Sequence, residues 1–154
     1  MIGVLAVQGA YMKHVEILDK LKIKSILVKT NNDLNNINGI IFPGGESTTI
    51  GKLLVNFGID KKLKQKILHG LPVFATCAGL ILLAKKIKSY NQFTFKILDI
   101  EVERNAYGRQ IDSFETDLHL KNIGNYRGIL LERQKLLIMA IMLKLLAIIK
   151  TVLF

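Results

Sequence analysis

The chain has 154 residues, of which half are hydrophobic, and it contains two prolines and one cysteine. This length is typical of one domain with a substantial core, and the composition excludes a disordered or collagen-like protein. A single cysteine excludes an internal disulfide and any cysteine-based zinc site. It also fits a reducing compartment, and Met1 leads into a strand-like run without signal-peptide features. We therefore expect a cytoplasmic protein.

The formal net charge is +10, with 18 lysines and 4 arginines. Such an excess can indicate a surface for nucleic acid or anionic lipid, or simply solvated faces rich in lysine. The lysines are scattered and no aromatic residues are interleaved with them, so we expect no nucleic-acid partner. The apolar residues 136–154 approach the length of a membrane span, but Lys144 falls near their middle. We therefore expect no membrane insertion either.

Short apolar runs predict four strands, at residues 2–7, 25–28, 39–42 and 72–76. Apolar residues at helical spacing predict four helices, at residues 11–21, 47–57, 60–68 and 78–88. Ser47 and Thr48 are expected to cap the second helix, and the Asn-rich residues 30–38 read as a loop. Alternating strands and helices imply parallel strands with helices on both faces. Residues 95–102 and 109–120 alternate apolar and polar side chains, which is typical of antiparallel strands.

The last 26 residues, 129–154, differ from the rest of the chain. Nineteen of them are Ala, Val, Ile, Leu, Met or Phe, and none is Gly, Pro, Asn or Asp. We therefore divide the chain into a main domain at 1–129 and an atypical apolar tail at 130–154. A shift of reading frame near codon 130 of an A/T-rich gene would produce this composition.

Cys77 lies where an apolar strand is expected to turn into a helix through the small residues Ala78 and Gly79. Such an elbow exposes a nucleophile, and the start of a helix offers backbone N–H groups to an oxyanion. The alternative interpretation is a buried structural cysteine.

Two polar segments accompany this elbow. Residues 43–48 (PGGEST) place a glycine pair after a strand, which lets backbone N–H groups approach a ligand, although a plain turn is the alternative. Residues 103–110 (ERNAYGRQ) contain two arginines that could bind a carboxylate, or simply form a polar hairpin. The three histidines, His14, His69 and His119, lie in polar settings typical of the surface.

Together these segments resemble the glutaminase subunits of pyridoxal 5′-phosphate synthase, which are triad-type (class I) glutamine amidotransferases. The resemblance runs from residue 2 to about residue 129 and is carried by VLAVQGA, IIFPGGESTTIGKLL, LPVFATCAGLILLAK and ILDIEVERNAYGRQIDSFETDL. It implies an α/β three-layer sandwich around a mixed, mostly parallel sheet, here incomplete at the C-terminus. It also implies hydrolysis of L-glutamine to L-glutamate and ammonia without a metal or cofactor. The ammonia would pass to a barrel-shaped synthase partner in a hetero-oligomer.

The resemblance assigns roles to individual residues. Cys77 matches the nucleophile that forms a γ-glutamyl thioester, and Arg104 matches an arginine that contacts glutamine. The glutamine-binding loop matches Gly45, Glu46 and Ser47, and the N–H groups of Gly45 and Ala78 would form the oxyanion hole. The family's His-Pro-Glu motif has no counterpart after residue 129, so activity is expected to be impaired. The alternative function is a catalytically inactive homologue that acts as a binding or scaffold protein.

Overall fold

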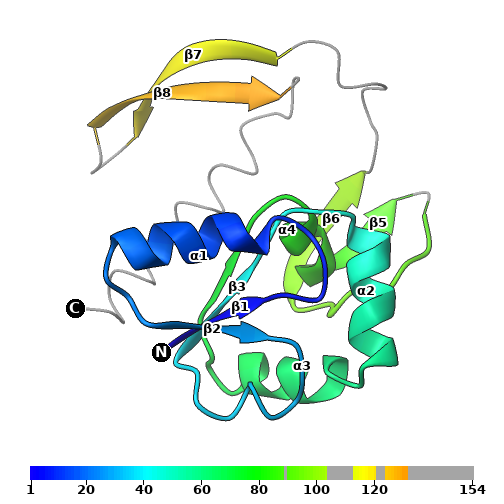
Figure 1. Cartoon of the computed structure of the whole chain (residues 1–154). Helices are drawn as coiled ribbons and strands as arrows, with labels where there is room; N and C mark the ends of the chain where they lie inside the picture. Colours follow the sequence, from blue (N-terminus) through cyan, green and yellow to red (C-terminus); the bar gives the residue numbers. More distant parts are fainter. Residues whose placement is uncertain (89, 104–112, 121–123, 132–154) are drawn as a thin grey trace. The chain divides into compact units, whose positions relative to one another are not determined.

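The computed structural model describes residues 1–88, 90–103, 113–120 and 124–131 (Figure 1). The chain divides into two compact units, with the boundary after Arg104. The described part of the first unit ends at residue 103, and that of the second is a hairpin of two strands. The predicted tail lies outside the described residues beyond Leu131.

A four-stranded parallel sheet forms the centre of the first unit. Its strand order is β2-β1-β3-β4, and every pairing is parallel, as predicted. The strands are β1 (Ile2–Leu5), β2 (Ser25–Val28), β3 (Gly39–Phe42) and β4 (Val73–Ala75). Because β3 and β4 are parallel neighbours, the loops that follow Phe42 and Ala75 leave the same edge of the sheet.

Four helices pack around this sheet: α1 (Tyr11–Lys20), α2 (Ser47–Asn56), α3 (Asp60–Leu68) and α4 (Ala78–Leu83). Figure 1 shows α1 on one side of the sheet and α3 on the other. Buried aliphatic and aromatic side chains fill the space between the sheet and its helices, among them Leu5, Phe42 and Leu54. A Cβ on Gly79 would lie 2.5 Å from the Phe42 carbonyl oxygen. Only glycine therefore lets α4 lie this close to β3.

The predicted helix at 78–88 is wrong in its second half. The helix α4 ends at Leu83, and residues Ala84–Lys88 form β5. The carbonyls of Leu82 and Leu83 accept hydrogen bonds from the N–H groups of Phe95 and Ile97, at 2.7 and 3.0 Å. The backbone around Phe95 and Ile97 thus occupies the two carbonyl acceptors that a further turn of α4 would need.

The expectation of an antiparallel strand at 95–102 is also wrong. The strand β6 (Leu98–Glu103) pairs in parallel with β5, and a register shift lies between Ala84 and Lys86. The segment at 109–120 was predicted correctly as antiparallel for its described part. There β7 (Ser113–Leu120) pairs with β8 (Gly124–Leu131), with Thr116 opposite Gly128. The strand β8 was not predicted, since Gly124 and Gly128 interrupt its apolar pattern.

Candidate active site

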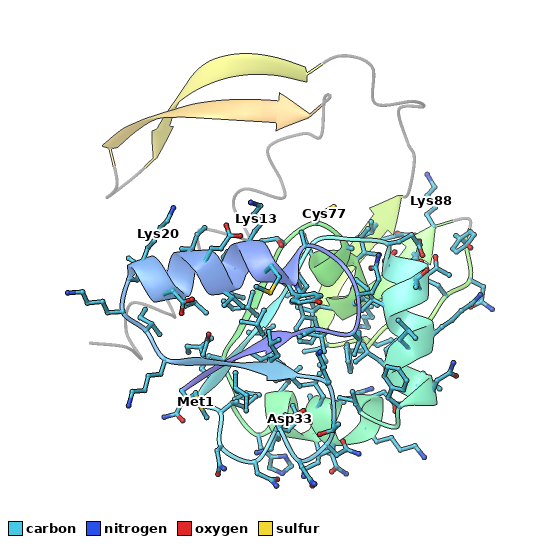
Figure 2. All side chains as sticks on the ribbon, viewed as in Figure 1. Met1, Lys13, Lys20, Asp33, Cys77 and Lys88 are labelled. Carbon is cyan, nitrogen blue, oxygen red and sulfur yellow. The ribbon has the colours of Figure 1, made fainter. Side chains whose placement is uncertain are left out.

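Cys77 occupies a sharp turn between β4 and α4. Its backbone φ is 46° and its ψ is −109°, a conformation that non-glycine residues rarely adopt and that surrounding contacts must hold. The side chain is exposed, so the alternative of a buried structural cysteine is wrong. Figure 2 labels this thiol beside α4. The elbow predicted from the small residues after Cys77 is confirmed.

The glycine loop after β3 lies against this turn. A Cβ placed on Gly44 would lie 3.5 Å from the Cβ of Cys77, in ordinary van der Waals contact. The loop follows β3 and Cys77 follows β4, and these neighbouring parallel strands bring the two segments together. The sequence predicted both segments, and the sheet topology explains why they meet.

A third segment, the turn after β1, completes the cluster and was not predicted as part of the site. The N–H of Ala10 donates to the Gly44 carbonyl at 2.9 Å, and the N–H of Glu46 donates to Oε1 of Gln8 at 3.2 Å. Gly9 has a φ of +99°, and a Cβ there would overlap the Gly44 carbonyl oxygen. The signal that could have found this turn is Gln8-Gly9 at the end of the strand that neighbours β3.

Glu46, predicted to bind substrate, caps α2. Its carboxylate accepts hydrogen bonds from the N–H groups of Thr48 and Thr49, at 3.1 and 2.6 Å. The prediction that Ser47 and Thr48 provide the cap is therefore wrong, because Ser47 already belongs to the helix. Ser47 is buried, and its hydroxyl donates to Oε1 of Gln92 at 3.2 Å. The hydrogen bonds of Glu46 and Ser47 therefore fix the end of the glycine loop at the start of α2.

The cap predicts a pH-dependent stability. Hydrogen bonds from the Thr49 hydroxyl, from Thr48 and from the two backbone N–H groups outweigh desolvation and lower the pKa of Glu46 from 4.5 to about 2. A carboxylate with a depressed folded-state pKa stabilises the fold above pH 4.5 and loses this contribution as the pH falls towards 2. We expect Glu46→Gln to lower the free energy of unfolding by about 0.5 kcal/mol at pH 7, the usual value of a negative charge at a helix start.

Urea unfolding of both proteins between pH 7 and pH 2 measures this effect. The difference between them should shrink below pH 4.5. Glu16→Gln is the matched control, since Glu16 is exposed on α1 and its carboxylate forms a surface ion pair with Lys13. A difference between Glu46→Gln and the parent protein that is constant over this pH range would contradict the capping role.

The remaining predicted site residues have different outcomes. Ala78 is buried as the first residue of α4, while Gly45 is exposed in the loop. Arg104 lies outside the described residues. His14 is partly buried, unlike the surface position that the sequence suggested, and burial lowers its pKa.

Within the described ranges, no group of three acidic, histidine or cysteine side chains gathers that could hold a metal ion, and no helix is long and apolar enough to cross a membrane.

The sequence pattern of the SNO glutamine amidotransferase family matches residues 4–140. The chain belongs to this family. The match extends beyond the domain boundary that the composition suggested at residue 129. The Cys77 turn, the glycine loop and the turn after β1 together form the candidate site.

Relatives of known name agree with this assignment. The chain is 54% identical over 123 residues to the pyridoxal 5′-phosphate synthase subunit PdxT of Thermotoga maritima, covering 80% of this chain and 65% of the relative. For the same subunit of Carboxydothermus hydrogenoformans, the identity is 52% and the coverages are 80% and 64%. The chain thus spans slightly less than two thirds of the length of these relatives.

Solved structures show the same fold. A crystal structure of a glutamine amidotransferase matches with a TM-score of 0.77 and 43% identity, covering 84% of this chain and 70% of that one. This likeness confirms the predicted α/β fold around a mostly parallel sheet. A putative peptidase E from Listeria monocytogenes matches with a TM-score of 0.51 at 14% identity, which supports the fold alone.

Proposed function

We propose that this chain is the glutaminase subunit of a pyridoxal 5′-phosphate synthase. It would bind L-glutamine at the glycine loop and release L-glutamate and ammonia. The ammonia would pass to a barrel-shaped synthase subunit in a hetero-oligomer. The names of the relatives support this assignment, and so does the geometry around Cys77.

The observation that carries the proposal is the exposed thiol of Cys77 on a strained turn beside Gly44. Strained backbone conformations persist where the surrounding structure holds them, and they are concentrated at functional sites. A cysteine of purely structural importance gains nothing from exposure on such a turn. The adjoining loop offers backbone N–H groups rather than bulky side chains, as an oxyanion site requires.

The proposed reaction proceeds by covalent catalysis. The sulfur of Cys77, having lost its proton, attacks the side-chain amide carbon of glutamine and forms a tetrahedral oxyanion. The N–H groups of Gly45 and Ala78 would stabilise this oxyanion. The C–N bond then breaks, and the nitrogen takes up a proton and leaves as ammonia. Water hydrolyses the γ-glutamyl thioester to glutamate and restores the thiol.

A glutamine-mimicking electrophile tests the proposal. We expect the diazoketone 6-diazo-5-oxo-L-norleucine to label Cys77, the single cysteine of the chain. Saturating L-glutamine should slow this labelling about tenfold or more, because substrate occupies the free site. Intact-protein mass spectrometry over time measures the rate.

Two controls make the result specific. D-Glutamine at the same concentration should protect poorly, and Cys77→Ala should remain unlabelled. Equal labelling rates with and without L-glutamine would show that the thiol reacts outside a glutamine site, and would overturn the proposal.

A further inference from the structure

The side chain of His14 connects α1 to the strand that carries the nucleophile. Its ring lies edge-on to Phe74, with ring centroids 6.2 Å apart and an interplanar angle of 76°. Its Nε2 lies 3.5 Å from Oγ1 of Thr76. Phe74 and Thr76 are two residues apart along β4 and its extension, so they face the same side of the sheet. His14 thus contacts that face immediately before Cys77.

Thr76 directly precedes the strained turn at Cys77, and hydrogen bonds hold it on both sides. Its N–H donates to the Phe42 carbonyl at 3.0 Å, and its own carbonyl accepts from Gly79 at 2.9 Å. Its hydroxyl lies 3.4 Å from the same Phe42 carbonyl. The backbone of Thr76 is therefore held by β3 and α4, while its side chain is held between β3 and His14.

The number of hydrogens on the Thr76 hydroxyl decides which group donates in the hydrogen bond between His14 and Thr76. A threonine hydroxyl carries one hydrogen and two acceptor lone pairs. With that hydrogen donated to the Phe42 carbonyl, the hydroxyl accepts a hydrogen from Nε2 of His14. Burial disfavours the charged ring and lowers the pKa of His14, so the ring is neutral. The contact with the Thr76 hydroxyl then places the single ring hydrogen on Nε2.

We infer that His14 is a positioning residue that holds the Cys77 turn in its strained conformation through Thr76. The inference rests on the proposed role of Cys77 as the nucleophile. No hydrogen bond joins His14 to the Cys77 sulfur in the part of the chain that the structure describes, so His14 acts through its neighbour. A strained backbone conformation persists only where the surrounding contacts hold it, and His14 supplies one of these contacts.

The test uses the full 154-residue chain labelled with ¹⁵N and ¹³C at cysteine, which gives one amide signal because Cys77 is the only cysteine. The nuclear Overhauser effect between its amide hydrogen and its own Hα strengthens at positive φ, where these hydrogens approach each other. His14→Phe keeps an aromatic ring against Phe74 but removes Nε2. We expect this variant to shift or split the Cys77 signal and to weaken that effect.

The same variant should change the reactivity of the thiol. Once the turn relaxes, the side chain loses its exposed position, and alkylation by iodoacetamide should slow about threefold or more. His14→Gln places an amide donor near the position of Nε2 and should restore the signal and most of the rate. This rescue distinguishes a hydrogen-bonding role from simple packing.

Two further variants complete the design. His69→Phe makes the same substitution at an exposed histidine at the end of α3 and should leave the Cys77 signal and rate unchanged. Thr76→Val removes the partner hydroxyl at constant shape and should reproduce His14→Phe, which keeps the test decisive if His14→Phe fails to fold. A folded His14→Phe or Thr76→Val protein with a parental Cys77 signal and alkylation rate would overturn the inference. Neither readout uses glutamine, so failure of the glutaminase proposal would be visible separately.

Discussion

Glutamine turnover by this 154-residue chain is expected to be slower by a factor on the order of 10³ or more than turnover by PdxT of Thermotoga maritima, because nucleophile and base act as a unit. A thiol needs a hydrogen-bonded base to deprotonate it and an acid to protonate the departing ammonia. Among the described residues, no histidine forms a hydrogen bond with the Cys77 sulfur. His14 contacts Thr76 instead, and His69 lies at the end of α3, before β4 begins.

Coupled assays of glutamate release measure this difference, with each protein alone and with a pyridoxal 5′-phosphate synthase barrel subunit from Thermotoga maritima. Cys77→Ala supplies the background rate. The labelling experiment is the companion measurement, because it needs only a reactive thiol in a glutamine site. Turnover equal to that of the relative would show that this chain supplies a complete base, and the expectation would be wrong.

Substitution of Gly9 by alanine is expected to have a large effect on folding stability. Gly9 has a φ of +99°, and an added Cβ would overlap the Gly44 carbonyl oxygen, which accepts the hydrogen bond from Ala10. The strain at positive φ costs about 1–2 kcal/mol, and the steric overlap should add about 2 kcal/mol more. The glycine loop would have to move away from the turn after β1, so the site should be disturbed together with the fold.

Gly70→Ala is the matched control for this experiment. Gly70 has the same φ of +99°, but among the described residues no heavy atom beyond its chain neighbours lies within 4 Å of the position its Cβ would take. The two variants therefore share the conformational strain and differ in the steric overlap. Urea unfolding should show Gly9→Ala to be less stable than Gly70→Ala by about 2 kcal/mol. Equal free energies of unfolding for the two variants would contradict the prediction, because the glycine loop could then move away from the turn after β1 without loss of stability.

Local sequence patterns were sufficient for most of the central sheet. The four apolar runs became β1 to β4, and all four helices begin where predicted, because burial of a short strand or of one helix face leaves a periodic signal. The reactive turn was also visible, since small residues after Cys77 permit a tight elbow. The glycine pair after β3 pointed to a second loop of the site. These features depend on neighbours along the chain.

Other features were decided by partners distant in sequence. The helix α4 ends where Phe95 and Ile97 take its carbonyls, although residues 84–88 alone continue a helical pattern. The sequence suggested a surface position for His14. In the fold, Thr76 lies beside its ring directly after β4, although the two residues are more than sixty positions apart in the chain.

The meeting of three loops at Cys77 follows from the strand order β2-β1-β3-β4. The sequence by itself therefore determined the four central strands, the starts of the four helices and the candidate nucleophile. The tertiary structure decided which side chains hold that nucleophile in place, because hydrogen-bond partners are chosen by distance in space and not by spacing along the chain.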